Sequence, residues 1–349
     1  MAALLDLALA HLRARKKLAD DTTEQALRLF TQADLNYLDA SWDALAPYLV
    51  AEVTAAQVTA ARQAAPYLDA ISDKRTKLSL VPEALGGVAG DGRELGPAMF
   101  GSITHTKTLI GGGWDPVLAF QSGAAFLATV VKTAIADAGR AGDDVMSANK
   151  GFTHYIRVVQ PGACSRCAIL AGKSSAEKPF LRHPNCHCTS MPANQKTPAG
   201  FFHGPDDYFQ SLSREEQDRI FTQSGAYAIR NGADPIKVVN ARRGASGIGY
   251  ASQGGLKASA ATRNRLQKVT IGRRADGSPL QVYATSEGTT SRGGFGKQQL
   301  ALKNQYTKSE NDRYRRTTSI RLMPESIMKM AGDSNERAVE LLKRYGYLY

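Results

Sequence analysis

Cysteine and long apolar runs are scarce in this chain of 349 residues. All four cysteines lie between Cys164 and Cys188, so the chain uses thiols in one place. No apolar run reaches the roughly 18 residues that a membrane span needs, and we expect no membrane partner. The first ten residues are apolar and basic residues follow them, which is the reverse order of a secretory signal. We therefore expect a reducing compartment, in which thiols favour a metal ion over a disulfide.

Several signature motifs of catalysis are also missing. The glycines between residues 85 and 115 do not form the G-x4-G-K-[ST] loop that cradles phosphates. The chain has no H-E-x-x-H pair and no serine in a nucleophile elbow. We therefore expect no enzymatic activity and no catalytic residues.

Acidic residues are sparse between residues 241 and 321. This segment holds 16 Lys or Arg and four acids, a net charge of +12. The whole chain, with 44 basic and 32 acidic residues, has the same net charge, so the remainder is neutral. Such an asymmetry predicts a polyanionic partner or an acidic protein surface.

The pattern of apolar residues predicts a mainly helical α+β fold. Large apolar side chains recur at helical spacing in the first 80 residues, where Asp21 resembles a helix start. Glycine is frequent from residue 85 to 115, which predicts loop. We divide the chain into an N-terminal helical arm (1–84), a Gly-rich linker (85–114), a central module (115–240) that contains a zinc knuckle (164–188), and a basic C-terminal module (241–349).

Within the last two modules the elements are shorter. A strand is expected over 152–159, because β-branched and aromatic residues dominate there. Ser213 and Glu216 have the spacing of a capping box, which predicts a helix that continues to about Arg230. The basic module is expected to have short strands and one terminal helix, from Pro324 to about residue 344.

The cysteines have the spacing of a metal-clasped knuckle. Cys164 and Cys167 form a C-x2-C pair, and a compact His/Cys cluster follows from residue 183 to 188. Six side chains compete for four positions around a Zn²⁺ ion: Cys164, Cys167, His183, Cys186, His187 and Cys188. We favour Cys164, Cys167 and Cys188, with His183 and Cys186 contesting the last position; His187 is expected to point away.

Other uses of these thiols stay open. They are unligated buried thiols, a disulfide between the two halves, and a cysteine nucleophile paired with His183 or His187. A structural zinc is favoured over a catalytic one, because a catalytic zinc keeps an open position and usually lies near a carboxylate base. The one acid inside the knuckle, Glu177, belongs to no recognisable motif.

The arrangement C-x2-C … His-Pro-Asn-Cys-x-Cys resembles the head-morphogenesis (Mu F-like minor capsid) family of tailed bacteriophages. Two later stretches look like the versions of this family found in phages of actinobacteria: residues 208–243 and the ending from Arg321 to Gly346. The likeness covers the chain from about residue 110 onward. In that family the metal-binding pattern corresponds to Cys164, Cys167, His183, Cys186 and Cys188. Arginine is frequent between the last two cysteines, where this chain has His187.

The resemblance implies a minor head protein that is associated with the portal vertex or the capsid interior during assembly. Its expected partners are the portal protein and the major capsid protein, and its expected locations are the virion and, during assembly, the host bacterial cytoplasm. Relatives are sometimes described as capsid maturation proteases. A maturation protease or another metal-dependent hydrolase is therefore the alternative hypothesis.

The basic segment is the second candidate site. Inside a phage head it could contact packaged double-stranded DNA without reading its sequence, since phosphate contacts need little beyond cations held in register. A solvated basic surface is the simpler alternative. The candidate contact residues are Arg242, Arg243, Arg273, Arg274, Arg313, Arg315 and Arg316.

Overall fold

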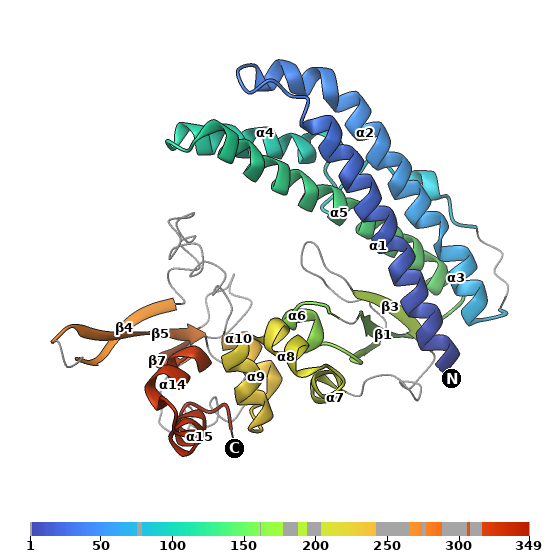
Figure 1. Cartoon of the computed structure of the whole chain (residues 1–349). Helices are drawn as coiled ribbons and strands as arrows, with labels where there is room; N and C mark the ends of the chain where they lie inside the picture. Colours follow the sequence, from blue (N-terminus) through green and yellow to red (C-terminus); the bar gives the residue numbers. More distant parts are fainter. Residues whose placement is uncertain are drawn as a thin grey trace. The chain divides into compact units, whose positions relative to one another are not determined.

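The computed structural model forms two compact units (Figure 1). It describes residues 2–74, 79–160, 162–176, 188–193, 204–241, 266–273, 277–287, 306–307 and 316–348. Unit 1 consists of Met1–Ala163 and Leu170–His203, and unit 2 of Cys164–Ile169 and Gly204–Tyr349. These units divide the chain differently from the four segments expected above, because the arm, the linker and the first part of the central module share one unit.

Unit 1 is built on long helices. The longest of them, α5, packs against α1, α2, α3 and α4, so it forms the centre of the helical layer. The core between them is apolar, and the rings of Phe30 and Phe120 stack with centroids 4.8 Å apart. The helices are α1 (Ala2–Phe30), α2 (Leu38–Arg62), α3 (Ala64–Ile71), the 3₁₀ turn η1 (Pro82–Leu85), α4 (Leu95–Gly111) and α5 (Pro116–Asn149).

Two expectations about this unit are wrong. Helix α1 continues through Asp21, because the hydroxyls of Thr22 and Thr23 bond the carbonyls of Leu18 and Ala19 inside the helix. The Gly-rich segment is also largely helical, since residues 95–111 form α4.

Three glycines, one on α4 and two on α5, allow these helices to pack closely against their neighbours. A Cβ at Gly101 on α4 would lie 2.9 Å from the ring of Phe126 on α5. On α5, a Cβ at Gly123 would lie 2.9 Å from the carbonyl oxygen of Ser102 and one at Gly142 would lie 2.9 Å from that of Ala61. Glycine therefore marks contact between helices here, at a modest cost in helix propensity.

Helix α5 begins with a capped first turn. Asp115 caps it by accepting hydrogen bonds from the backbone N–H groups of Val117 and Leu118, and Pro116 occupies its first turn. Among the described residues, α5 is the one helix whose length and composition would suffice to cross a membrane. Its buried residues recur every three or four positions and face its neighbouring helices, as in a core helix.

A three-stranded antiparallel sheet completes unit 1. Its strand order is β2 (Ser174–Ala176), β1 (His154–Val159) and β3 (Cys188–Ala193). Strand β1 confirms the strand expected over 152–159. Ile156 and Met191 of the sheet pack with Tyr67 and Leu68 of α3 in a second apolar cluster, which joins the sheet to the helices.

Unit 2 has short helices with well-defined ends. Ser213 and Glu216 form the predicted capping box, but the helix ends at Phe221, because Thr222 has a positive φ of 63° and starts a new helix. Gly332, with φ 58°, likewise splits the expected terminal helix. The helices are α6 (Ser165–Ala168), α7 (Pro205–Gln210), α8 (Arg214–Phe221), α9 (Gln223–Arg230), α10 (Pro235–Ala241), α14 (Pro324–Ala331) and α15 (Asn335–Arg344).

The second sheet lies in unit 2 and has four antiparallel strands in the order β4-β5-β7-β6. They are β4 (Leu266–Arg273), β5 (Pro279–Glu287), β6 (Tyr306–Thr307) and β7 (Arg316–Leu322). Strands β4 and β5 agree with the short strands expected in the basic module. The described structure is thus a mainly helical α+β fold, as predicted.

Candidate functional site

Cys164 and Cys167 lie on one tight turn of unit 2. Cys164 has extended backbone angles and precedes the short helix α6, and the Cys167 N–H donates to the Cys164 carbonyl oxygen at 2.9 Å. Cys164 is exposed and Cys167 is buried. The turn brings two thiols three residues apart onto one loop, which is the local geometry of a C-x2-C clasp.

Cys188 lies in unit 1, at the first position of β3. It pairs with Val159, and Arg157 stands two residues before Val159 on β1, so the side chains of Cys188 and Arg157 share one face of the sheet. Its Sγ accepts hydrogen bonds from Arg157 Nη1 at 3.1 Å and Arg140 Nη2 at 3.3 Å. Arg140 Nη2 also donates to the Cys188 carbonyl oxygen. Two guanidinium groups therefore donate to one sulfur.

The structure thus places three of the predicted ligands, Cys164 and Cys167 in unit 2 and Cys188 in unit 1. His183, Cys186 and His187 lie outside the described residues. Within the described ranges, no three side chains of His, Cys, Asp or Glu gather closely enough to hold a metal. The zinc knuckle therefore stays a prediction.

The basic segment is described in part. Arg273 at the end of β4 is exposed, and its Nη1 donates to the Gly277 carbonyl oxygen at 3.1 Å across the turn. The backbone of Arg316 pairs with Glu287 and Thr307 in the sheet. The other candidate contact residues lie outside the described residues: Arg242, Arg243, Arg274, Arg313 and Arg315.

The two later stretches that resemble the phage family pack against each other in unit 2. Helix α14 contacts α9, and Thr222 Oγ1 donates to Glu325 Oε1 at 3.2 Å. The backbone N–H of Asp234 donates to the carbonyl oxygen of Tyr347 at 3.2 Å. The Tyr347 ring is fully buried, and its hydroxyl donates to the Leu322 carbonyl oxygen at 2.8 Å. Residues on either side of the basic segment therefore form one module.

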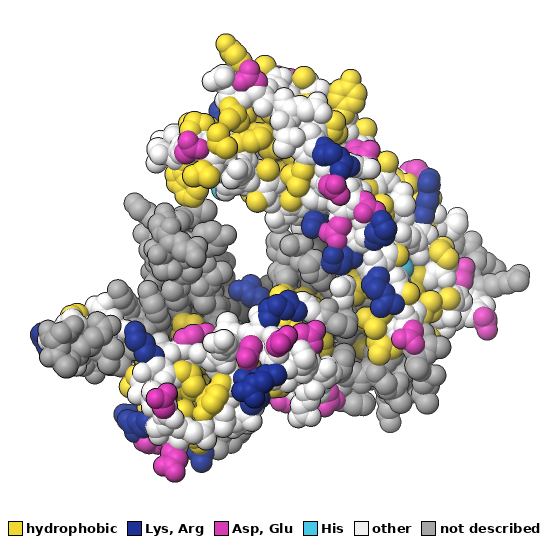
Figure 2. Space-filling model, viewed as in Figure 1, with side chains coloured by type: hydrophobic (Ala, Val, Ile, Leu, Met, Phe, Trp, Pro, Cys, Tyr) yellow, Lys and Arg dark blue, Asp and Glu magenta, His cyan; other side chains and the backbone are white. Residues whose placement is uncertain are grey.

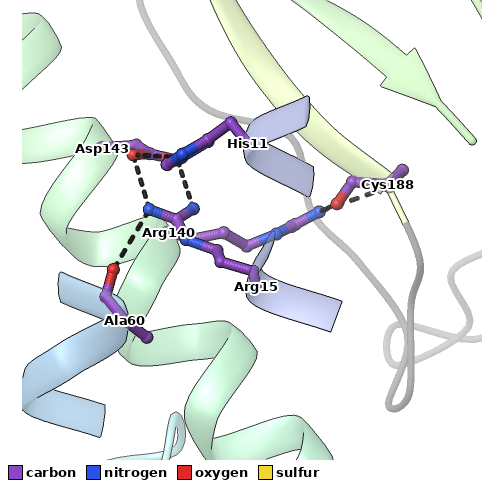
Figure 3. Close-up of polar contacts among 6 residues, drawn as sticks. All are labelled: His11, Arg15, Ala60, Arg140, Asp143 and Cys188. Atoms are coloured by element: carbon purple, nitrogen blue, oxygen red, sulfur yellow. Dashed lines mark hydrogen bonds and ion pairs between the residues drawn. The ribbon is translucent and has the colours of Figure 1, made fainter. Parts of the chain in front are cut away.

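Unit 1 contains a buried ion cluster that the sequence analysis missed: His11, Arg15 and Asp143 (Figure 3). Arg15 binds Asp143 with both terminal nitrogens, at 2.5 and 2.8 Å, and Nη2 also donates to the Ala60 carbonyl oxygen at 3.4 Å. His11 Nε2 lies 3.2 Å from Asp143 Oδ1, and its ring stacks on Tyr67 with centroids 3.8 Å apart. A bidentate ion pair of this kind fixes the register between α1 and α5.

Burial and pairing compete in setting the charges of this cluster. Burial alone would raise the pKa of the Asp143 carboxyl, but the charge of Arg15 and hydrogen bonds from His11 and Arg15 outweigh it, so the pKa is lowered. Burial lowers the pKa of His11; the hydrogen bond from His11 to Asp143 opposes this effect, and the Arg15 charge adds to it. The cluster is therefore a neutral histidine beside a paired aspartate and arginine.

The next residue, Asp144, is treated differently by the fold. Burial, together with the charge of Asp143, raises the pKa of its carboxyl to about 7. Its Oδ1 is buried and has no hydrogen-bond partner among the described residues. Adjacent aspartates on α5 thus have pKa values shifted in opposite directions.

A small pocket lies beside this cluster, between α1, α5 and the sheet of unit 1. Its volume is about 50 Å³. Arg15 lines it and also belongs to the buried ion cluster. We call it the cationic pocket; its lining residues are Leu12, Arg15, Lys16, Ala19, Asp20, Lys132, Ala136, Arg140, Gln160, Cys188 and Thr189.

A signal for this pocket is present in the sequence but is not specific. Lys16 and Asp20 have the i, i+4 spacing of one helix face, and Lys132 and Arg140, eight residues apart, also lie on one face of their helix. Charged helix faces are usually solvated, and Figure 2 shows basic and acidic side chains interspersed along α1. Nothing local in the sequence reveals that two such faces meet each other and the start of β3.

The comparisons with known proteins add no relative to this picture. No family model, curated protein or solved structure matches the chain. Function must therefore be argued from the residues and from the described geometry.

Proposed function

We propose that this chain is a minor capsid protein of a tailed phage, a structural and assembly component near the portal or in the capsid interior. The observation that supports this proposal best is the module in unit 2. Two stretches that resemble the same phage family, separated by about 80 residues of basic sequence, pack together through α9, α14 and the buried Tyr347. Two stretches that belong to one family domain are expected to pack against each other in its fold.

In this proposal a structural Zn²⁺ is held by Cys164, Cys167 and Cys188 together with His183 or Cys186. The tight turn at α6 fits the first half of a clasp, because a C-x2-C pair grips one ion from a single loop. The guanidinium donors on Cys188 fit the outer shell of a bound thiolate, since they offset its negative charge. The ion would supply folding energy by joining the two halves of the knuckle.

The basic segment belongs to the same unit: it follows α10 in the chain and ends in β7. Strands β4 and β5 pair antiparallel, and the exposed Arg273 is the last residue of β4. We propose that this segment contacts packaged DNA or an acidic face of the portal or capsid, without reading sequence.

The decisive experiment is composition analysis of assembled heads. The chain should co-purify with portal and major capsid proteins from heads of the phage that encodes it, in few copies per head. Its absence from purified heads would overturn the structural proposal. Major-capsid processing that depends on this chain would favour the hydrolase alternative instead.

Zinc binding is tested on the purified full-length chain. We expect close to one zinc per chain, with loss of metal and of folded protein on Cys164→Ser, because structural zinc contributes folding energy. Ser165→Ala, on the same turn, is the matched control and should keep the metal. A folded Cys164→Ser protein that retains zinc would contradict the proposed ligand set.

A further inference from the structure

The cationic pocket of unit 1 is unexplained by any role in head assembly. We propose that it is a binding site for a phosphate-sized oxyanion. The inference goes beyond the proposed function and does not depend on it.

The charges that line the pocket are strongly unbalanced. Four cations contribute to its wall, Arg15 and Lys16 from α1 and Lys132 and Arg140 from α5, against the single acid Asp20. Lys16 and Lys132 both bridge Asp20, the latter at 2.7 Å, so one carboxylate serves two ammonium groups. Asp143 offsets Arg15 from behind. The carboxyl of Asp144 also offsets part of the charge of Arg140. Three acids, Asp20, Asp143 and Asp144, thus stand against four cations, so a positive excess remains, and close cations of this kind attract an anion.

The pocket has the size and the opening that such an ion requires. A cavity of about 50 Å³ exceeds several-fold the 10–15 Å³ or so that a single water needs. The space exists because two wall positions are alanines, Ala19 and Ala136. The side chains of Lys16, Asp20 and Lys132 are 31–37% exposed, whereas Thr189 and Cys188 are 2% exposed. The pocket therefore opens at the lysines and has a buried floor at the start of β3.

Donors are available at the floor and on the wall. The Thr189 hydroxyl is buried, and among the described residues it has no hydrogen-bond partner. Arg140 uses Nη2 for Cys188, as Figure 3 shows, while its Nε and Nη1 make no hydrogen bond to the described part of the chain. A buried hydroxyl without a partner is costly, and a bound oxyanion would satisfy it.

These features select the class of ligand. An apolar molecule would leave the Thr189 hydroxyl and the Arg140 donors unsatisfied. Arginine and lysine donors around a compact space are suited to a tetrahedral oxyanion, and arginine in particular presents paired donors to phosphate. The ligand is either free phosphate or the terminal phosphate of a small monoester.

The test is a phosphate titration of the full-length protein at constant ionic strength, with chloride as the balancing anion. We expect the melting temperature to rise with phosphate concentration and then to saturate, because a ligand that binds the native state stabilises it. Thr189→Val should weaken phosphate binding by about tenfold, the loss of one hydrogen bond to a charged group. Glycerol 3-phosphate in a parallel titration separates the two sources: comparable binding assigns a monoester, and binding of inorganic phosphate alone assigns the free ion.

Three further variants make the result decisive. Ala136→Met fills the pocket without changing any charge, and Arg140→Gln removes one cation; both should abolish the phosphate effect. Lys17→Gln removes an equal charge from the exposed face of α1, outside the pocket, and should keep the effect in full. The proposal is overturned if phosphate has no effect beyond that of chloride, or if Ala136→Met, folded by circular dichroism, responds as the wild type does. Should Arg140→Gln not fold, Ala136→Met decides alone.

Discussion

The buried ion cluster and the cationic pocket lie side by side in unit 1 and use charge in opposite ways. In the cluster, Arg15 and Asp143 satisfy each other bidentately in a buried site. In the pocket, cations outnumber acids, and the lysines keep contact with solvent. The difference shows that one arginine and one carboxylate match where water is excluded, whereas cations remain in excess where a ligand or solvent can enter.

The largest effect is expected when the arginine is removed from the buried ion cluster. Arg15→Met leaves Asp143 buried beside a neutral histidine, and we expect a loss of about 3–5 kcal/mol in the free energy of unfolding. Chemical denaturation measures this change. Lys17→Met, at an exposed position on the same helix, should leave stability nearly unchanged. Equal effects of the two variants would show that the buried pair has no special weight.

The second prediction concerns the space that α5 leaves for Arg15. A Cβ at Gly139 would lie 2.6 Å from Arg15 Nε, so Gly139→Ala must displace the guanidinium. We expect a destabilisation of about 1–3 kcal/mol, as for other overpacked sites. Gly111→Ala is the control, because no heavy atom lies within 4 Å of a Cβ there. That control should stabilise α4 by up to about 1 kcal/mol through helix propensity, and a destabilised Gly111→Ala would undermine the argument.

The third prediction uses the contrast between the two aspartates. The pKa of Asp144 is raised to about 7 in the folded protein, so its favourable contribution is complete below the ordinary aspartate pKa and is lost as pH rises towards 7. Asp144→Asn should therefore stabilise the protein at pH 8 by on the order of 1 kcal/mol, and by much less near pH 4. Denaturation curves at both pH values measure this difference. Asp73→Asn, at an exposed position, should show no such pH-dependent gain.

The smallest expected effect on stability concerns the Thr189 hydroxyl at the pocket floor. Without phosphate, Thr189→Val should leave the melting temperature nearly unchanged or slightly higher, because it removes a buried hydroxyl that has no partner in the described structure. A large loss of stability in phosphate-free buffer would mean that the hydroxyl is satisfied in solution, and would remove one of the donors assigned to the pocket.

Much of the fold was predictable because local patterns dominate it. The strand at β1, the capping box at Ser213 and the helix opening at Asp115 all follow from short-range chemistry. The errors arose where local and tertiary preferences conflict. Frequent glycine predicted loop, but residues 95–111 form α4, where Gly101 packs closely against Phe126 of α5. The turn at Thr222 depends on a backbone angle that threonine rarely adopts.

The sites were less predictable than the fold. The C-x2-C turn could be placed from its spacing alone, whereas the position of Cys188 depends on the strand register of β1 and β3. His11 and Asp143 are 132 residues apart, and no local pattern links them. Arg15 appeared in the sequence only as one of several bases after an apolar N-terminus. Its role depends on Gly139, whose missing side chain gives the guanidinium its space.

The three glycines along α5 have a consequence for how this helix can change in length. Gly123 lies against α4, Gly139 against α1, and Gly142 against α2 and α3. At each of these positions the side of α5 that faces its neighbour must therefore carry no side chain. One inserted residue turns everything beyond it by about 100° and moves it by about 1.5 Å, which would replace these bare faces with side chains. Seven inserted residues would turn it by only about 20° from two full turns. Insertions and deletions between Gly123 and Gly139 should therefore be tolerated only in multiples close to whole turns.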